Sequence, residues 1–240
     1  MKTIAIIQAR MGSTRLPEKI LKPVGNTDNL TYVTERCKRI QGVSEVIVAT
    51  STLSQDDAVE QWCIEHQIAY YRGSEVDVLD RFVQCAKPYS PDYILRVTAD
   101  CPFVDYEMAS EVVACMQEKQ VDIVDLSDGL PRGLAVEMVS YQALTYIHEH
   151  GHETRHREHV TYYAYEFKEE FSRTTYQVPY NRQYPDLRIT LDTEEDYALI
   201  SKIGQHFNDV RVSSVDVINY LIEHPEVAKI NAHIEQKPVV

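Results

Sequence analysis

Short apolar runs alternate with longer amphipathic stretches over the first half of the chain. The apolar runs predict buried strands at Thr3–Gln8, Glu45–Ala49, Ile68–Tyr71, Tyr93–Val97 and Asp122–Leu126. The stretches between them have apolar residues at helical spacing and cover Leu30–Arg39, Asp56–His66, Val78–Lys87 and Tyr106–Lys119. Strands that alternate with helices are typical of parallel pairing. The pattern therefore predicts an α/β fold in which helices sandwich a sheet.

The second half of the chain has more polar residues between its apolar segments. A strand is predicted at Leu134–Ser140 and a helix at Tyr141–His150, followed by a His-rich polar segment and a Tyr-rich helix. "RTTYQVPY" and "DLRITL" predict two more strands, and helices are predicted at Thr193–Phe207 and Ser213–His224. We interpret residues 1–240 as a single domain with a protruding segment near residues 128–186.

The composition restricts the class of protein. The chain of 240 residues is 44% hydrophobic and 25% charged, which is typical of a globular domain. Its formal net charge of −13 and its pI near 5.1 argue against nucleic acid as the main partner. No apolar run is long enough to span a bilayer, and the start "MKTIAIIQAR" does not resemble a signal peptide. The five cysteines form no C-x-x-C pair, so we expect reduced thiols in a cytoplasmic protein without a membrane partner.

Cations and small polar residues follow the first predicted strand directly, although the chain as a whole is acidic. In "ARMGSTRLPEK", Arg10, Arg15 and Lys19 supply positive charge, and Ser13 supplies a hydroxyl group. Gly12 permits close approach of the backbone to a ligand. Because such sheets bind ligands beyond the carboxyl ends of their strands, this composition indicates a phosphate-binding loop. The spacing matches neither a P-loop nor a dinucleotide fingerprint, and a solvated basic loop is the alternative.

Two aspartates occupy similar positions at the ends of predicted strands. Asp100 follows the strand at Tyr93–Val97 in "RVTADCPFVD", and Asp192 lies in "ITLDTEEDY". Mg²⁺ is usually held by one or two protein carboxylates together with phosphate oxygens, so Asp100 at the end of its strand is a candidate ligand. Each has a structural alternative. Asp100 can be a turn residue before Pro102, and either Asp192 or Thr193 can be the N-cap of a helix.

The segment "HGHETRHREH" matches H-E-x-x-H, the zinc-binding pattern of metalloproteases, at His152 and His156. That pattern requires a helix whose apolar neighbours pack the ligands into a core. Here the flanking residues include Gly151, Arg155 and Glu158, and no clear third ligand follows. We therefore favour a solvated or substrate-facing segment over a zinc site.

The stretch "IIQARMGSTRLPEKIL" resembles the nucleotide-binding loop of the spore coat polysaccharide biosynthesis cytidylyltransferases, relatives of the CMP-sialic acid and CMP-Kdo synthetases. The resemblance continues in order through "VIVATSTLSQDD", "YRGSEVDVLDRF", "LRVTADCPFVD", "PRGLAVEMVS", "REHVTYY" and "RITLDTEEDY". It implies a nucleotidyltransferase fold of the glycosyltransferase-A type, with a mixed, mostly parallel sheet. The implied reaction is transfer of CMP from CTP to an acidic, nonulosonic-type sugar, with Mg²⁺ as cofactor and pyrophosphate as product. The family also implies a homodimer.

The resemblance assigns roles to particular residues. Catalysis is assigned to Arg15, Lys19 and Asp100, and metal binding to Asp100 and Asp192. The residues implied in nucleotide binding are Ala9, Arg10, Gly12, Ser13, Thr14, Arg15, Lys19, Thr50, Ser51, Arg72, Gly73 and Ser74. The residues implied in recognition of the acidic sugar are Arg132, Glu137, Arg157 and His159.

Two rival interpretations stay open at this point. A nucleotidyltransferase or glycosyltransferase of the same fold can act on another base or acceptor, because the fold does not determine the acceptor. A nucleotide-binding module without turnover belongs to another class of protein, and the presence of both Asp100 and Asp192 argues against it.

Overall fold

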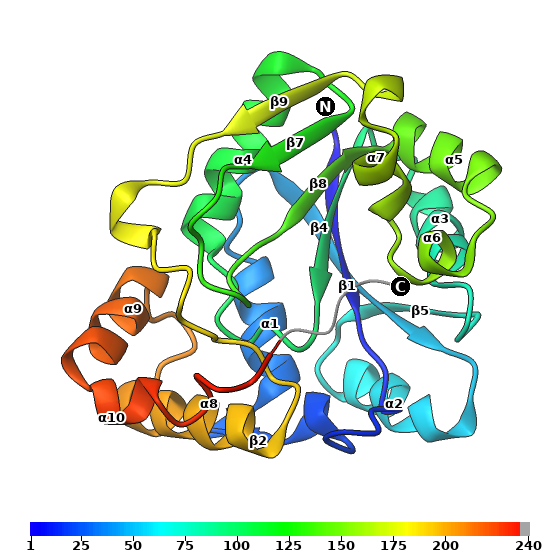
Figure 1. The fold of residues 1–240 in the computed structure, drawn as a ribbon. Coiled ribbons are helices and arrows are strands. Elements are labelled where there is room, and N and C mark those ends of the chain that lie inside the picture. The colour runs from blue at the N-terminus through cyan, green and yellow to red at the C-terminus, as the bar shows by residue number, and fades with distance from the viewer. Residues whose placement is uncertain (236–240) are drawn as a thin grey trace.

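The computed structural model describes residues 1–235 of the chain, in which a seven-stranded sheet has helices on both faces (Figure 1). Its strands, in their order across the sheet, are β5 (Ala69–Gly73), β4 (Val43–Ser51), β1 (Thr3–Gln8), β6 (Tyr93–Thr98), β8 (Glu137–Ser140), β7 (Ile123–Leu126) and β9 (Arg173–Tyr176). β8 runs antiparallel to both of its neighbours, whereas the other neighbouring strands are parallel. The predicted mixed, mostly parallel α/β sheet is confirmed.

Helices cover both faces of this sheet. Their bounds are α1 (Asn29–Cys37), α2 (Asp57–Glu65), α3 (Val78–Ala86), α4 (Tyr106–Lys119), α5 (Tyr141–His150), α6 (Thr154–Glu158), α7 (Tyr162–Glu166), α8 (Glu194–Phe207), α9 (Ser214–Glu223) and α10 (Pro225–Ala228). One face packs against α1, α2 and α4, and the opposite face against α3, α5 and α7. α8, α9 and α10 surround a third apolar core beside the lower edge of the sheet in Figure 1.

β1 lies inside the sheet because its side chains are apolar on both faces. Ile4, Ala5, Ile6 and Ile7 are all fully buried. Ala5 and Ile7 belong to one apolar core, and Ile4 and Ile6 belong to the core on the opposite face. A strand that is covered by helices on both faces has no polar side, which explains its unbroken apolar run.

The prediction of a strand at "DLRITL" is wrong, because within the described chain this segment makes only an isolated bridge between Arg188 and Arg132. The N–H of Ile189 donates to the carbonyl of Arg132 at 2.7 Å, so the segment bonds to a loop and not to a ladder. The close approach of this segment to the loop requires Gly133, which has φ +97°, because a Cβ there would lie 2.1 Å from the carbonyl oxygen of Ile189. The side chain of Arg132 is exposed beside this contact.

Other elements of the second half agree in type with the prediction but are shorter. The strand predicted from Leu134 begins at Glu137, and "RTTYQVPY" is a strand over Arg173–Tyr176 only. Residues 128–186, predicted to protrude, contribute β8 and β9 to the main sheet. A ribbon of β2 (Pro23–Val24) and β3 (Thr27–Asp28) is absent from the prediction, because two-residue strands have no periodic pattern. Among residues 1–235, no helix is long and apolar enough to cross a membrane.

The carboxyl ends of β1 and β6 lie side by side. Gln8 and Thr98, the last residues of the two strands, are register partners. The N–H of Ala99 donates to the carbonyl of Gln8 at 2.9 Å, and the N–H of Leu191 donates to the carbonyl of Asp100 at 2.8 Å. These bonds hold the start of α8 against the same edge of the sheet, which is where α/β sheets bind their ligands.

Candidate active site

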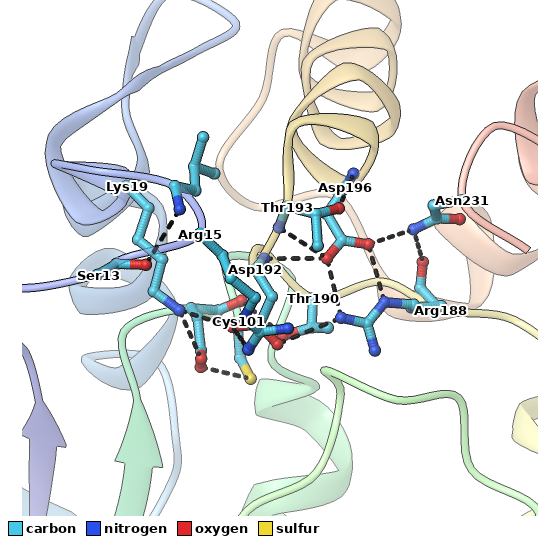
Figure 2. Close-up of polar contacts among 12 residues, drawn as sticks. Ser13, Arg15, Lys19, Cys101, Arg188, Thr190, Asp192, Thr193, Asp196 and Asn231 are labelled. Carbon is cyan, nitrogen blue, oxygen red and sulfur yellow. Dashed lines mark hydrogen bonds and ion pairs between the residues drawn. The ribbon is translucent and has the colours of Figure 1, made fainter. Parts of the chain in front are cut away.

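Lys19 lies between two aspartates that are far apart in the sequence (Figure 2). Its Nζ donates to Oδ2 of Asp100 at 3.0 Å and to Oδ1 of Asp192 at 2.8 Å. Arg15 approaches the same oxygen of Asp192, with its Nη2 at 3.5 Å. Lys19 begins a short 3₁₀ helix, Asp100 follows β6, and Asp192 precedes α8. The structure thus brings together the residues to which the sequence assigns catalysis and metal binding.

One oxygen of each aspartate is held by the protein, and the other faces Lys19. Thr98 Oγ1 donates to Oδ1 of Asp100 at 2.5 Å, and Arg188 Nη2 donates to Oδ2 of Asp192 at 3.2 Å. The remaining oxygens, Oδ2 of Asp100 and Oδ1 of Asp192, are the two that Lys19 binds. Two carboxylate oxygens therefore converge on a single cation.

The start of α8 explains why Asp192 is available to this cluster. Thr193 is the N-cap: its hydroxyl accepts from the N–H of Asp196 at 3.2 Å, and Asp196 accepts from the N–H of Thr193 at 3.1 Å. This capping box satisfies the helix end without Asp192. Of the two roles predicted for this segment, capping therefore belongs to Thr193, and the carboxylate of Asp192 faces Lys19.

The charges in the cluster stabilise one another. Burial alone would raise the pKa of Asp100, but the Lys19 ammonium and the hydrogen bond from Thr98 lower it to about 2. Burial alone would lower the pKa of Lys19, but Asp100 and Asp192 raise it above its ordinary value. Lys19 and Asp100 are therefore both charged at neutral pH. Burial and the charge of Asp100 raise the pKa of the Cys101 thiol, so that thiol is protonated and is not a nucleophile.

The loop between β1 and Lys19 becomes more exposed from Ala9 to Arg15. Ala9 is buried, Gly12 and Ser13 are half-buried, and Thr14 and Arg15 are exposed. The exposed part is the part that carries Arg15 toward Asp192. A phosphate group arriving from solvent can therefore reach the hydroxyl groups and the guanidinium without any rearrangement of the core.

Acidic side chains on neighbouring elements hold the start of this loop. Arg10 Nη1 lies 3.4 Å from Oε1 of Glu75, and the N–H of Met11 donates to Oδ1 of Asp56 at 2.6 Å. Asp56, which the sequence did not single out, also accepts from the hydroxyl of Ser51. These contacts tie the loop to the ends of β4 and β5.

The residues predicted to bind nucleotide after β4 and β5 are largely part of the fold. Thr50 and Ser51 are fully buried, and Gly73 is the register partner of Ser51. The hydroxyl of Thr50 has no hydrogen-bond partner among the described residues. Ser74 Oγ accepts from the N–H of Asp77 at 3.0 Å. Their side chains support the edge of the site, and the prediction that they contact a nucleotide stays a prediction.

Two of the predicted binding arginines are paired with carboxylates of the fold. Arg72 pairs with Asp57 at 2.7 Å and with Glu60, both on α2. Arg157 pairs with Asp77, the N-cap of α3, with Nη2 at 2.5 Å from Oδ2. A carboxylate partner offsets the charge of an arginine and occupies some of its N–H donors, which weakens its attraction for an anionic ligand. Neither arginine is among the residues gathered around Lys19.

Two residues predicted to bind the sugar, Glu137 and His159, are near a buried arginine that the sequence did not single out. Arg96 Nη1 donates to Oε1 of Glu137 at 2.6 Å, and its Nη2 donates to the side-chain oxygen of Gln8 at 3.0 Å. The hydroxyl of Thr161 also donates to Glu137. Burial lowers the pKa of His159, so its imidazole is neutral at pH 7. The group joins β1, β6 and β8 across one face of the sheet.

The H-E-x-x-H pattern does not form a zinc site. α6 contains His156 but begins after His152, so the two histidines do not share the helix that the pattern requires. His156 is buried with its Nε2 at 2.7 Å from Oε2 of Glu166, whereas His152 is exposed. Within residues 1–235 no group of three or more His, Cys, Asp or Glu side chains is placed to hold a metal ion. The arrangement of His152 and His156 therefore differs from that of the metalloprotease pattern.

The donor set around Lys19 suits a hard divalent cation better than zinc. Asp100 and Asp192 offer carboxylate oxygens, and Mg²⁺ uses one or two of these with water and phosphate oxygens as its other ligands. The Lys19 ammonium between the two carboxylates is a cation at the point where a metal would bind. The residues present therefore fit the predicted magnesium.

Three residues behind Asp192 are absent from the predicted site (Figure 2). Arg188 Nε donates to Oδ1 of Asp196 at 2.8 Å, and Asn231 Nδ2 donates to the same oxygen at 2.7 Å. Arg188 and Asp192 precede α8, so their spacing from Asp196 follows no helical rule that sequence analysis could have used. Nothing in the sequence around Asn231 indicates its position.

Comparison with known proteins adds to this geometry. The sequence model of a family described as cytidylyltransferase matches residues 4–217. The chain is 34% identical over 232 residues to the spore coat polysaccharide biosynthesis protein SpsF of Bacillus subtilis, across 93% of this chain and 95% of SpsF. A solved structure of a cytidylyltransferase from Leptospira borgpetersenii is similar with a TM-score of 0.89 and 30% identity, and covers 99% of this chain and 100% of that one.

A more distant structural neighbour concerns the fold alone. The structure of CMP:2-keto-3-deoxy-manno-octonic acid synthetase complexed with CTP is similar with a TM-score of 0.64 at 16% identity, across 87% of this chain and 99% of that one. The predicted nucleotidyltransferase fold is therefore confirmed. The predicted likeness to the spore coat proteins and their relatives is confirmed as well.

Proposed function

The chain belongs to the cytidylyltransferase family and is a nucleotidyltransferase, and from that premise we propose that it transfers CMP from CTP to an acidic, nonulosonic-type sugar with release of pyrophosphate. The observation that carries the proposal is the convergence of Asp100 and Asp192 on Lys19, with Arg15 beside them. This cluster lies at the edge where α/β sheets bind their ligands.

The choice of nucleotide and acceptor is supported by the relatives. The synthetase that shares the fold was solved with CTP, and its name specifies an acidic sugar. SpsF is named for biosynthesis of spore coat polysaccharide. By the same resemblance we expect a role in surface or spore-coat polysaccharide synthesis, a cytoplasmic location and a homodimer, which light scattering would test.

Mg²⁺ belongs to the proposal as the cofactor, and Asp100 and Asp192 would hold it. When bound, the ion would offset triphosphate charge and lower the pKa of the attacking hydroxyl. The protein's own part is to aim one oxygen of each aspartate at a common point, through the bonds from Thr98 and Arg188. These bonds orient the two carboxylates before any ligand arrives, so neither carboxylate needs to reorient during the reaction.

In this proposal Lys19 and Arg15 exchange their aspartate partners for the triphosphate when CTP binds. Without a ligand, Lys19 pairs with both Asp100 and Asp192. With CTP bound, its ammonium donates to phosphate oxygens, and the two aspartate oxygens become available to a cation. Arg15 is exposed and needs only to leave a contact of 3.5 Å. Both cations then stabilise the charge that develops on the leaving pyrophosphate.

The reaction itself needs no covalent enzyme intermediate. The sugar hydroxyl oxygen forms a bond to the α-phosphorus, and the bond from that phosphorus to the bridging oxygen breaks. The pyrophosphate keeps the electron pair, and the hydroxyl proton passes to solvent. The protein contributes position and charge stabilisation.

The acceptor is placed beside Asp100 in this proposal. Arg96 and Thr98 point to the same face of β6 because side chains alternate along a strand. The group around Arg96 therefore lies next to the hydroxyl that holds Asp100. Glu137 and the neutral His159 suit sugar hydroxyl groups, and the exposed Arg132 suits a sugar carboxylate.

The test is a screen of CTP, UTP, ATP and GTP against a set of acidic and neutral sugars, read by pyrophosphate release. We expect release with CTP and an acidic sugar, dependent on Mg²⁺. Comparable turnover with a purine triphosphate or a neutral sugar would support the rival nucleotidyltransferase. A glycan product would support the glycosyltransferase, and binding of CTP without turnover on any acceptor would support the binding module.

A further inference from the structure

Asn231 lies outside the part of the chain that matches the family model, yet it contacts the network behind Asp192. The match ends at residue 217, and Asn231 follows α10. It is fully buried, and its Nδ2 donates to Oδ1 of Asp196 at 2.7 Å and to the carbonyl of Arg188 at 3.0 Å (Figure 2). One amide group thus bonds to both members of an ion pair.

Asp196 is the residue that Asn231 helps to hold. Its Oδ1 accepts from Arg188 Nε at 2.8 Å as well as from Asn231, and its Oδ2 accepts from Arg188 Nη2 at 2.9 Å. The same Oδ2 accepts from the backbone N–H groups of Asp192 and Thr193, at 3.0 and 3.1 Å. The carboxylate is fully buried, and these donors lower its pKa against the effect of burial. Asp196 therefore holds the guanidinium of Arg188 and the backbone of Asp192 in place.

Arg188 links Asp196 to the side chain of Asp192. Its guanidinium bonds twice to Asp196, at 2.8 and 2.9 Å, and reaches Oδ2 of Asp192 at 3.2 Å. Because Asp196 neutralises most of its charge, Arg188 orients Asp192 without taking both of its oxygens. Oδ1 of Asp192 is left to face Lys19. Without the pair to Asp196, the guanidinium would compete with any other cation for Asp192.

We propose that Asn231 is a positioning residue, and that the C-terminal segment acts through Asp196 and Arg188 to orient Asp192 toward the metal site. The inference rests on the role that the proposed function gives to Asp192. It adds to the site a contact from beyond the family match, so cytidylyltransferases that differ in this segment would differ in metal affinity. Removal of a group that bonds directly to a metal ligand typically changes metal affinity or activity by about 10- to 100-fold, and Asn231 acts on Asp192 through two such groups, Arg188 and Asp196.

Asn231→Ala is the test variant, and Asn219→Ala is its matched control. Asn219 is exposed on α9, so the same atoms are removed from the same part of the chain without loss of the network. The readout is Mn²⁺ affinity by electron paramagnetic resonance, without nucleotide, together with kcat for pyrophosphate release. We expect Asn231→Ala to weaken Mn²⁺ binding about ten-fold and to lower kcat, with both values unchanged in Asn219→Ala.

Asp196→Asn tests the direction of the chain of contacts. It removes the charge that pairs with Arg188 at 2.8 Å, so Arg188 is expected to bind Asp192 more strongly and Mn²⁺ binding to fall further than in Asn231→Ala. The double variant is expected to resemble Asp196→Asn, because both residues act through one path. Thermal unfolding of each variant shows whether a loss of Mn²⁺ binding comes from misorientation of Asp192 or from unfolding of the protein.

Each outcome has a stated meaning. Wild-type Mn²⁺ affinity and kcat in a folded Asn231→Ala overturn the inference, as does an equal loss in Asn219→Ala. If the wild type binds no Mn²⁺ but releases pyrophosphate, the metal assignment fails and kcat alone decides about Asn231. If the wild type binds Mn²⁺ but does not turn over CTP, the proposed function fails and Mn²⁺ affinity decides. A wild type that does neither overturns both.

Discussion

Two regions of the molecule are rich in charged residues, and they use those charges differently. At the ends of β1 and β6, Lys19 joins carboxylates that are 81 and 173 positions away in the sequence. Around α6, Arg155 pairs with Glu153 and Glu166, and His156 pairs with Glu166. The first region gathers charges on one lysine, whereas the second divides its charges among separate ion pairs, with Arg157 paired to Asp77.

The difference shows which of the two can bind a ligand. In the first region Oδ2 of Asp100 and Oδ1 of Asp192 accept from Lys19, and Arg15 also approaches Oδ1 of Asp192; in the proposal these cations exchange the carboxylates for phosphate. In the second region Arg155 and His156 already have carboxylate partners, so a ligand would have to break structural contacts. A motif in the sequence therefore indicates less than a convergence of charges from separate strands.

The largest effect is expected from Asp192→Asn. The substitution removes the charge from the point of convergence, and Thr193 still caps α8, so the helix is retained. Pyrophosphate release is expected to fall about 100- to 1,000-fold, with partial recovery at high Mg²⁺ or with Mn²⁺. Full activity at low Mg²⁺ would mean that Asp192 has no part in the reaction.

A somewhat smaller effect is expected from Lys19→Met. The variant loses the cation for the triphosphate, so kcat/KM for CTP is expected to fall about 100-fold. Because Asp100 and Asp192 then lack their ammonium partner, Mn²⁺ alone is expected to bind about ten-fold more tightly than to the wild type. A fall in kcat/KM together with tighter Mn²⁺ binding would show that Lys19 exchanges aspartates for phosphate, because general damage to the fold would weaken both. Weaker binding of both ligands would contradict the exchange.

A moderate effect on stability is expected in acid. The pKa of Asp100 is lowered from 3.8 to about 2 in the folded protein, so its pairing contributes stability above pH 3.8. That contribution is lost as the pH falls from 3.8 toward 2, because the proton is bound first in the unfolded state. Thermal unfolding at several pH values in this window would measure the loss. Asp100→Asn is expected to show a shallower dependence, and an identical dependence would remove Asp100 as its source.

The smallest effect on activity is expected in the region of α6. His156→Ala removes the bond to Glu166 from a buried site, so the free energy of unfolding is expected to fall by about 1–3 kcal/mol. Pyrophosphate release at a temperature well below unfolding should be unchanged, and so should release in Glu153→Gln. A zinc-specific chelator should likewise have no effect. Loss of activity in all three experiments would restore the zinc interpretation.

The sequence was sufficient for the parts of the site that depend on strand ends. Apolar runs gave the ends of β1 and β6, and polar residues directly after them gave Lys19 and Asp100. The family resemblance pointed to Asp192, although its supposed strand does not exist, and the capping pattern alone indicated only the start of α8. Contacts that depend on tertiary structure could not be predicted, and the bond from Asn231 to Asp196 is the clearest example.

The ion-pair partners of the arginines also could not be predicted from the sequence. Arg72 and Arg157 occupy positions that the family resemblance assigns to ligands, and both have fold carboxylates as partners. Arg96, which was not predicted, is buried within a strand, where an apolar residue is expected. A charge in a sequence does not show which partner it will have, because partners come from other segments.

Calorimetric titration of CTP with Mg²⁺ into Arg15→Met and Arg157→Met tests the central claim most directly. Both variants lose one guanidinium and keep a side chain of similar length, one in each charged region. The account predicts about ten-fold weaker CTP binding for Arg15→Met and an affinity within about two-fold of wild type for Arg157→Met, with both variants folded. Unchanged CTP binding by Arg15→Met, or an equal loss in Arg157→Met, would contradict the claim that convergence of charges marks the nucleotide site.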